Sequence, residues 1–386
     1  MTINMGPQHP STHGVLRLVL ELDGETIVKA TPVIGYLHTG IEKTIEMKNY
    51  TQSLTMTDRA DYLSPLSNNL AYSLAVEKLL GCEIPKRVQY IRVLLAELTR
   101  IASHLVWLGT HALDIGAVTI FLWCWRERER ILALFEELSG VRMMTSYIRP
   151  GGLYEDLPVG WLDRVRHFAE TFPAAIDEYD TMLTKNPIWV RRTKGVGYLS
   201  KEDCLAYSLT GPLLRAAGVA YDVRKAQPYS SYEEFEFDIP VFTASDVYDR
   251  YLVRMEEMRQ SVRIINQALE RITPPPGPYQ TPDRRVARPP FADIDQSMES
   301  LIYHFKLVTE GFQVPPGEAY AAVESARGEL GIFLVADGSN KPYRCRFRPP
   351  SFINLQALPA MVEGRLIADA VAVIGSIDIV LGEVDR

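Results

Sequence analysis

Strict alternation of apolar and polar residues predicts the first structured segment of the chain. The leucines at alternate positions from Leu16 to Leu22 fall on one side of a period-2 pattern, the spacing of a strand buried on one face. The turn sequence Asp23-Gly24 follows, and then a second β-rich run, ETIVKATPVIG. Two such runs separated by Asp-Gly indicate a β-hairpin. The loop GPQHPSTHGV leads directly into this hairpin.

From about residue 64 the apolar residues recur at steps of three and four, which is the period of an α-helix. Gly81 and Gly140 stand where a glycine ends a helix, and Pro173 favours a kink in the fourth of these segments. The pattern predicts long helices over residues 64–81, 86–114, 120–140, 156–186 and 245–272.

The last third of the chain has a mixed pattern. A proline-rich connector, 273–290, precedes a short helical segment at 295–309 and two β-like runs, 319–325 and 331–337, joined by a turn. We therefore predict an α+β fold in one integrated domain, with an N-terminal antiparallel β-sheet, a central long-helix bundle and a C-terminal α/β segment that folds back. The predicted regions are 1–62, 63–272 and 273–386.

Composition narrows the class of function. The chain has 386 residues, 47% of them hydrophobic and 23% charged, which is enough for a large core. A net charge of -7 gives no electrostatic support for nucleic-acid binding. The four cysteines form no Cys-x-x-Cys motif, which argues against a zinc or iron–sulfur site built from cysteines. We expect no signal peptide and no bilayer-spanning segment, and hence a soluble cytoplasmic protein unless a partner holds it at a membrane.

Two histidines lie in the loop before the hairpin. His9 and His13 are four residues apart, but Pro7 and Pro10 make a helix with both on one face very unfavourable. Either each imidazole satisfies backbone groups in a tight turn, or the stiff loop holds the pair for binding. A metal site would need further ligands, for which His38 in GYLHTG is the nearby candidate.

The segment TMTDRADYLS, residues 55–64, gathers two acids, a cation and a phenol: Asp58, Arg59, Asp61 and Tyr62. In the structural interpretation Arg59 pairs with the acids and Tyr62 is half-buried. In the functional one the ion cluster fixes the backbone, and Tyr62 offers a phenolic hydrogen bond in a dry pocket.

A polar stripe follows the predicted helix 86–114, at steps of three, four and seven: Glu97, Arg100, His104, His111 and Asp114. Such a stripe is either a solvated face or, because the rest of the helix is apolar, a set of buried charges that require partners. A buried Asp114 would orient a histidine and stabilise its protonated form.

The C-terminal sequence AVAVIGSIDIVLGEVDR is an apolar run that ends in acids and Arg386, which suggests a tail tucked into the fold or an interface. Taken alone, the residues indicate a proton-competent site of histidine, tyrosine and aspartate in an apolar helical protein.

Several motifs are more specific in combination than separately: MGPQHPSTHGVLRL, DRADY, THALDIGA, YIRPGG, DVRKAQPYSSY, DRYLVRMEEMRQS, MESLIYHFKLVTEGFQVPPGEAY and DIVLGEVDR. Together they resemble the D subunit of respiratory NADH–quinone oxidoreductase, complex I, in the order of that family and over residues 4–386. The resemblance implies a peripheral-arm subunit on the cytoplasmic side of the cell membrane. It would form the quinone-head site with a small iron–sulfur subunit, contact further peripheral-arm and membrane-arm subunits, and couple quinone reduction to proton translocation without a cofactor of its own.

The resemblance also implies roles for single residues. His13 and Tyr62 correspond to the histidine and tyrosine that hydrogen-bond the quinone carbonyls, and Asp114 corresponds to the carboxylate paired with that histidine. Supporting positions near the quinone are His9, His38, Thr39, Arg59, Thr110 and Val380.

The family is also similar to the large subunit of nickel–iron hydrogenases, with which VESARGELGIFLV looks shared. In our placement Asp61, Ser64, Val380 and Glu383 stand where those enzymes carry metal-binding cysteines, so no thiolate remains and no metal is expected. Thr39 departs from the arginine that many relatives carry after the histidine of LLHRG, which removes a positive charge near the iron–sulfur cluster.

Two other functions fit the same resemblance. One is the equivalent subunit of a related complex driven by ferredoxin, since other polypeptides accept the electrons. The other is a scaffold subunit without chemistry, against which the intact set of His13, Tyr62 and Asp114 argues.

Overall fold

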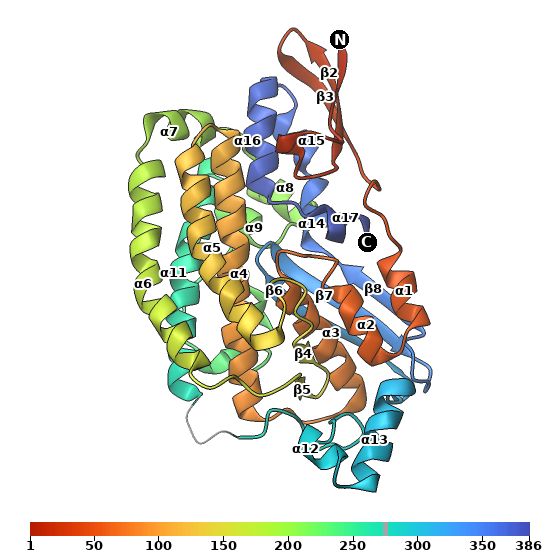
Figure 1. Ribbon diagram of the computed structural model, residues 1–386. Coiled ribbons are helices and arrows are strands. Elements are labelled where there is room, and N and C mark those ends of the chain that lie inside the picture. Colours follow the sequence, from red (N-terminus) through yellow and green to blue (C-terminus); the bar gives the residue numbers. More distant parts are fainter. Residues whose placement is uncertain (273–276) are drawn as a thin grey trace.

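Two three-stranded antiparallel sheets flank a layer of long helices (Figure 1). The computed structural model describes residues 1–272 and 277–386. In the N-terminal sheet Leu18 and Leu20 are fully buried, and Gly24 turns the chain with a φ of 60°, so the predicted hairpin is confirmed. A further strand before the histidine loop, β1, was not predicted. The strands are β1 (Thr2–Met5), β2 (Arg17–Asp23) and β3 (Thr26–Val33), in that order across the sheet.

The five predicted long helices are all present. Gly81 and Gly140 end two of them in the left-handed conformation, with φ of 62° and 78°. Pro173 lies inside the fourth helix, which continues across it. The helices are α3 (Pro65–Leu80), α4 (Lys86–Asp114), α5 (Val118–Ser139), α6 (Trp161–Leu183) and α11 (Val247–Arg271).

Helix α4 lies at the centre of the helical layer. It packs against α5 on one side and α11 on another, and α6 contacts both of those helices (Figure 1). Leu94, Leu98 and Leu105 are completely buried, as is almost every residue from Ile91 to Leu108. Polar side chains in this part of α4 are therefore buried with the apolar ones, and each requires a partner.

The C-terminal sheet consists of β6 (Gly317–Ser325), β7 (Gly328–Ala336) and β8 (Arg344–Arg348). Ala326 and Arg327 form the two-residue turn between β6 and β7, because Ser325 pairs with Gly328. Helix α3 packs on β6 and β7. The two β-like runs and their turn were predicted, whereas β8 was not.

Two helices inside the predicted N-terminal β-region were missed, α1 (Ile41–Met47) and α2 (Tyr50–Thr57). The predicted helix at 295–309 is α13 (Met298–Thr309). Residues 273–276 of the predicted connector lie outside the described residues. None of the helices in the described ranges combines the length and apolarity needed to cross a membrane.

The remaining elements are short: η1 (Pro10–Thr12), β4 (Ile148–Arg149), β5 (Gly152–Leu153), α7 (Pro187–Thr193), α8 (Lys201–Ala206), α9 (Pro212–Ala216), α10 (Val223–Ala226), η2 (Tyr232–Glu234), α12 (Phe291–Ile294), α14 (Pro350–Leu355), α15 (Leu358–Val362), α16 (Ile367–Ile377) and α17 (Leu381–Asp385).

A buried ion pair joins α3 to α4. Both terminal nitrogens of Arg92 donate to Glu77, at 2.9 and 2.6 Å. Arg92 Nη2 also donates to the carbonyls of Arg149 and Gly152, while Glu77 accepts from the Gly151 amide at 2.9 Å. The pair therefore fixes the turn between β4 and β5 as well as the two helices.

We predict that Arg92→Met lowers the free energy of unfolding by about 3–5 kcal/mol, because the Glu77 carboxylate stays buried without its cation. Denaturant unfolding of the full chain measures this. The double variant Glu77→Gln/Arg92→Met should lose less, since no uncompensated charge remains, and Arg191→Met on the exposed part of α7 serves as the control. An unfolding midpoint for Arg92→Met equal to that of the unmodified chain would contradict the prediction.

Candidate functional site

A fully buried guanidinium, Arg327, connects three distant segments of the chain. Its Nη1 donates to Asp61 Oδ2 at 2.8 Å and to Ser103 Oγ at 3.1 Å. Its Nε and Nη2 donate to the backbone and side chain of Asp378, at 2.9 and 3.3 Å. Arg327 thus ties the loop after α2, the middle of α4 and the end of α16 to the β6–β7 turn. It was not among the residues predicted from the sequence, although VESARGELGIFLV contains it.

The turn that carries Arg327 is itself closely packed. A Cβ atom on Gly211 would lie 2.4 Å from the Arg327 carbonyl oxygen, and one on Gly328, at a φ of 132°, would lie 2.5 Å from Thr210 Oγ1. Arg100 donates to the carbonyls of Glu324 and Ser325 at 2.6 and 2.8 Å. The absence of side chains at the two glycines allows this contact, so the guanidinium has a fixed origin.

Four members of the polar stripe on α4 are buried and belong to the support of this turn. Glu97 accepts from Arg100, from Arg224 and from the Tyr232 and Ser261 hydroxyls. His104 Nε2 lies 2.8 Å from Glu257, and burial lowers the pKa of His104 to about 4. The stripe is therefore a set of buried, partnered charges rather than a solvated face.

His111, the fourth of these, has an apolar environment. Its ring lies 5.5 Å from that of Trp107 and 5.3 Å from that of Trp189, between centroids. Both ring nitrogens are buried without a hydrogen-bond partner in the part of the chain that the structure describes. Burial, reinforced by the charge of Arg254, lowers the pKa of His111 to about 3, so the imidazole is neutral.

The loop between β1 and β2 brings His13 to α17. His13 follows the single 3₁₀ turn η1 in the left-handed conformation, with a φ of 50°. A Cβ atom on the next residue, Gly14, would lie 4.0 Å from Leu381 Cδ1. His13 Nε2 is buried with no hydrogen-bond partner among the described residues, and burial, followed by the charge of Arg327, lowers the pKa of His13 to about 4.

Tyr62 reaches the same short helix from the loop after α2. A Cβ atom on Gly382 would lie 2.6 Å from the Ala60 carbonyl oxygen and 3.2 Å from Tyr62 Cε1, so the glycine permits a close approach. Tyr62 is half-buried, and burial and the Asp61 carboxylate raise the pKa of its phenol. Since Leu381 and Gly382 are adjacent, His13 and Tyr62 approach neighbouring residues of α17.

Asp114 lies at the other end of the histidine loop. Its Oδ1 accepts from the Ser11 hydroxyl at 3.2 Å, and burial raises the pKa of Asp114 above its usual range. Within the described ranges, no hydrogen bond or ion pair joins Asp114 to His13. His9 accepts the Ser11 amide at 3.2 Å and so satisfies the backbone of the turn. Asp114 therefore contacts the loop through Ser11.

Two carboxyl groups near Arg327 bind protons more tightly than usual. Glu383 is buried in α17, where Oε1 accepts the Ser351 amide at 3.0 Å and Oε2 has no partner among the described residues. Burial and the negative charge of Asp61 raise the pKa of Glu383 to about 8. Burial raises the pKa of Asp378 to about 6, although Arg327 opposes the shift.

The other predicted residues lie around this cluster. His38 Nδ1 is 2.7 Å from the Asp385 carbonyl oxygen, and Thr39 beside it is exposed. Arg59 is exposed and donates to the Thr55 carbonyl, whereas Asp61 pairs with Arg327, so the expected pairing of Arg59 with both acids is not seen. The remaining two supporting residues make backbone contacts: Thr110 donates to the Val106 carbonyl at 2.9 Å, and buried Val380 donates from its amide to Ser351 Oγ at 3.2 Å.

Comparisons with known proteins decide the family. The family described as "Respiratory-chain NADH dehydrogenase, 49 Kd subunit" matches residues 114–386. The second of the numbered NADH-quinone oxidoreductase D subunits of Roseiflexus sp. (strain RS-1) is 62% identical over 387 residues, covering 100% of this chain and 93% of the relative. Its counterpart in Koribacter versatilis (strain Ellin345) is 60% identical and covered to 96%. The NADH-quinone oxidoreductase D subunit of Geotalea uraniireducens (strain Rf4) is 56% identical and covered to 98%; both alignments span 100% of this chain.

The chain belongs to the family of NADH-quinone oxidoreductase D subunits. As a complex I subunit it has other subunits of that enzyme as partners. In the described part of this complex I subunit, no group of three or more histidine, cysteine, aspartate or glutamate side chains is arranged to hold a metal ion. The positions compared with the hydrogenase cysteines instead include Asp61 and Glu383, which interact electrostatically beside Arg327.

We predict that Glu383→Gln changes the pH dependence of stability in this complex I subunit. The pKa of Glu383 is about 8 in the folded protein, whereas the ordinary value for a glutamate is 4.5, so the native carboxyl keeps a proton that the unfolded chain releases between these pH values. The free energy of unfolding of the unmodified chain therefore falls as pH rises through this window, and the glutamine variant lacks that loss.

Denaturant unfolding at pH 5 and pH 8 tests this, with the exposed Glu21→Gln as control. The stability of Glu383→Gln relative to the unmodified chain should be higher at pH 8 than at pH 5. An equal difference at both pH values would contradict the raised pKa.

Proposed function

We propose that the surroundings of α17 form the site where the head group of a quinone is bound and reduced in the peripheral arm of the complex. The observation that carries the proposal is the approach of His13 and Tyr62 to the adjacent residues Leu381 and Gly382. A quinone head is a flat apolar ring with two carbonyl acceptors, so it requires an apolar surface with one or two hydrogen-bond donors. Val380 and Leu381 provide apolar side chains beside the two donors.

The protonation states support this role. Tyr62 has a raised pKa and keeps its hydroxyl proton, while His13 has a pKa of about 4 and is neutral at physiological pH. A neutral imidazole carries one N–H, so each side chain offers one hydrogen-bond donor. These donors are suited to the two carbonyl oxygens and to the negative charge that accumulates on them during reduction.

The reaction consumes two electrons and two protons for each quinone. We assign the electrons to the iron–sulfur cluster of the neighbouring small subunit, and the protons to Tyr62 and His13, so that both carbonyl oxygens become hydroxyls. The donors must then recover protons from solvent. Asp114, whose pKa is raised and which contacts the loop through Ser11, is positioned to take part in that recovery.

Loss of both protons leaves negative charge in a poorly solvated place. Such charge is costly unless a cation or a proton compensates it. We propose that this cost drives the change that couples quinone reduction to proton translocation by the membrane arm. The chain itself would act on the cytoplasmic side of the membrane, held there by the complex.

We predict that Tyr62→Phe in the assembled complex lowers the rate of NADH-dependent quinone reduction at least tenfold, because one donor to the quinone is lost. NADH oxidation with a hydrophilic artificial acceptor should be unchanged, since that acceptor takes electrons before the quinone site. Tyr198→Phe, on an exposed tyrosine, is the control. Unchanged quinone reduction by Tyr62→Phe would refute the proposed role.

We also predict that Asp114→Asn slows quinone reduction while the complex still assembles, because the amide accepts the Ser11 hydrogen bond but binds no proton. Ser11→Ala, which removes the same contact and leaves the carboxylate, should have a smaller effect. Blue-native electrophoresis and turnover measurements on membranes check both. Loss of assembly in Asp114→Asn would indicate a structural carboxylate instead.

A further inference from the structure

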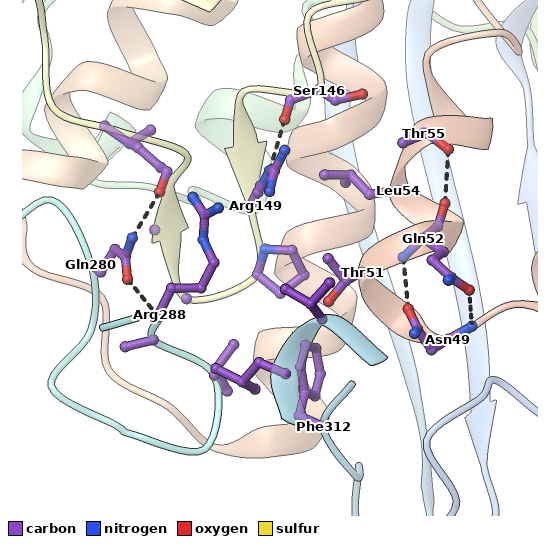
Figure 2. A pocket seen from close by; sticks show the side chains of 18 residues that line it. Asn49, Thr51, Gln52, Leu54, Thr55, Ser146, Arg149, Gln280, Arg288 and Phe312 are labelled. Carbon is purple, nitrogen blue, oxygen red and sulfur yellow. Dashed lines mark hydrogen bonds between the residues drawn. The ribbon is translucent and has the colours of Figure 1, made fainter. Parts of the chain in front are cut away.

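A second concave site lies away from α17, near the end of the molecule that carries α12 and α13 (Figure 1). It is a cavity of about 360 Å³ between α2, the β4–β5 segment and α13. Leu54, Leu153 and Phe312 supply much of its apolar lining, and Arg149 and Arg288 are its two charged residues (Figure 2). Nothing in the quinone chemistry uses these residues.

The two arginines lack acidic partners. The guanidinium carbons of Arg149 and Arg288 lie 4.1 and 4.4 Å from the ring centroid of Tyr154, so both cations stack on the same aromatic side chain. Their side-chain hydrogen bonds go to carbonyl oxygens, from Arg149 Nε to Ser146 and from Arg288 Nη2 to Tyr154. Across residues 1–272 and 277–386, neither forms a salt bridge with a carboxylate, although most buried cations are paired.

The like charges affect one another. Burial, and to a smaller extent the charge of Arg288, lower the pKa of Arg149 to about 10. Arg149 is therefore still charged at physiological pH, and two guanidinium groups repel one another at the wall of one cavity. A carboxylate between them would relieve this repulsion and accept charge-assisted hydrogen bonds.

The apolar part of the site continues outside the cavity. On α13 the exposed side chains follow helical spacing, with 51–76% of each accessible: Met298, Leu301, Ile302, Phe305 and Val308. Val308 also lines the cavity, so the apolar face of α13 and the cavity form one continuous surface. Large exposed apolar patches of this kind mark interaction sites.

We propose that this surface is the docking site for a segment of another subunit of the complex, which places an aspartate or glutamate carboxylate between Arg149 and Arg288 and apolar side chains on α13. Charge complementarity selects an acidic occupant. The continuation of the surface over the whole length of α13 favours a polypeptide over a small amphiphile, which would need only the cavity. Membership in a multisubunit enzyme supplies such partners in fixed ratio.

Photo-crosslinking in the assembled complex tests the proposal. We would replace Val308, 56% exposed at the mouth of the cavity, by p-benzoyl-phenylalanine, and use Val159, which is fully exposed, as the control position. After irradiation of membranes, mass spectrometry of the adduct should identify a peptide of another complex subunit with an aspartate or glutamate near the crosslink. Adducts only with lipid, or only within this chain, would overturn the proposal.

Two sets of variants then test the charge. Arg149→Gln/Arg288→Gln should reduce the yield of that crosslink at least tenfold, whereas Arg191→Gln on exposed α7 should leave it unchanged. Replacing the identified carboxylate of the partner by its amide should give the same loss without any change in this chain, which excludes misfolding as the cause. An undiminished yield in either experiment would overturn the assigned ion pairs.

Discussion

The architecture of the site depends on one buried cation that has to be neutralised. Arg327 lies on a tight turn of the C-terminal sheet, with carboxylates supplied by the loop after α2 and by the end of α16. A guanidinium removed from water is tolerated only with such partners, so the three segments are held together or all are destabilised. His13, Tyr62 and the start of α17 lie around this ion cluster. The polar stripe of α4 stabilises it from behind by fixing the backbone of the turn.

Much of the fold follows from local patterns. The period of apolar residues predicted the long helices closely, with 86–114 matching α4, because a buried helix imposes that period over many turns. Strand β1 and helices α1 and α2 were missed, since four to eight residues carry too little periodicity. They are stabilised instead by contacts with segments that are distant in the sequence, such as the pairing of Ile3 with Leu20.

The candidate site was predictable only in part. The loop histidines, Tyr62 and Asp114 were recognised from residue type and motif, and whether they act in catalysis stays a prediction. Their partners were not recognised: Asp114 contacts Ser11, and Asp61 pairs with Arg327 rather than Arg59. Each of these contacts joins residues separated by more than 100 positions, and no local pattern encodes such a pairing. The unpaired Arg149 and Arg288 were likewise invisible, because the lack of a partner is a property of the folded chain.

The long separation of the groups that meet at Arg327 also has a kinetic consequence. Asp61 and Arg327 are 266 residues apart, and the loop closed between them contains most of the helical layer. Contacts of high sequence separation incur a large loss of chain entropy before they contribute stability, so they form late in folding. The helical layer and the two hairpins therefore have to be largely assembled before the cation meets its carboxylates. Until then, the folding intermediate contains secondary structure but no site.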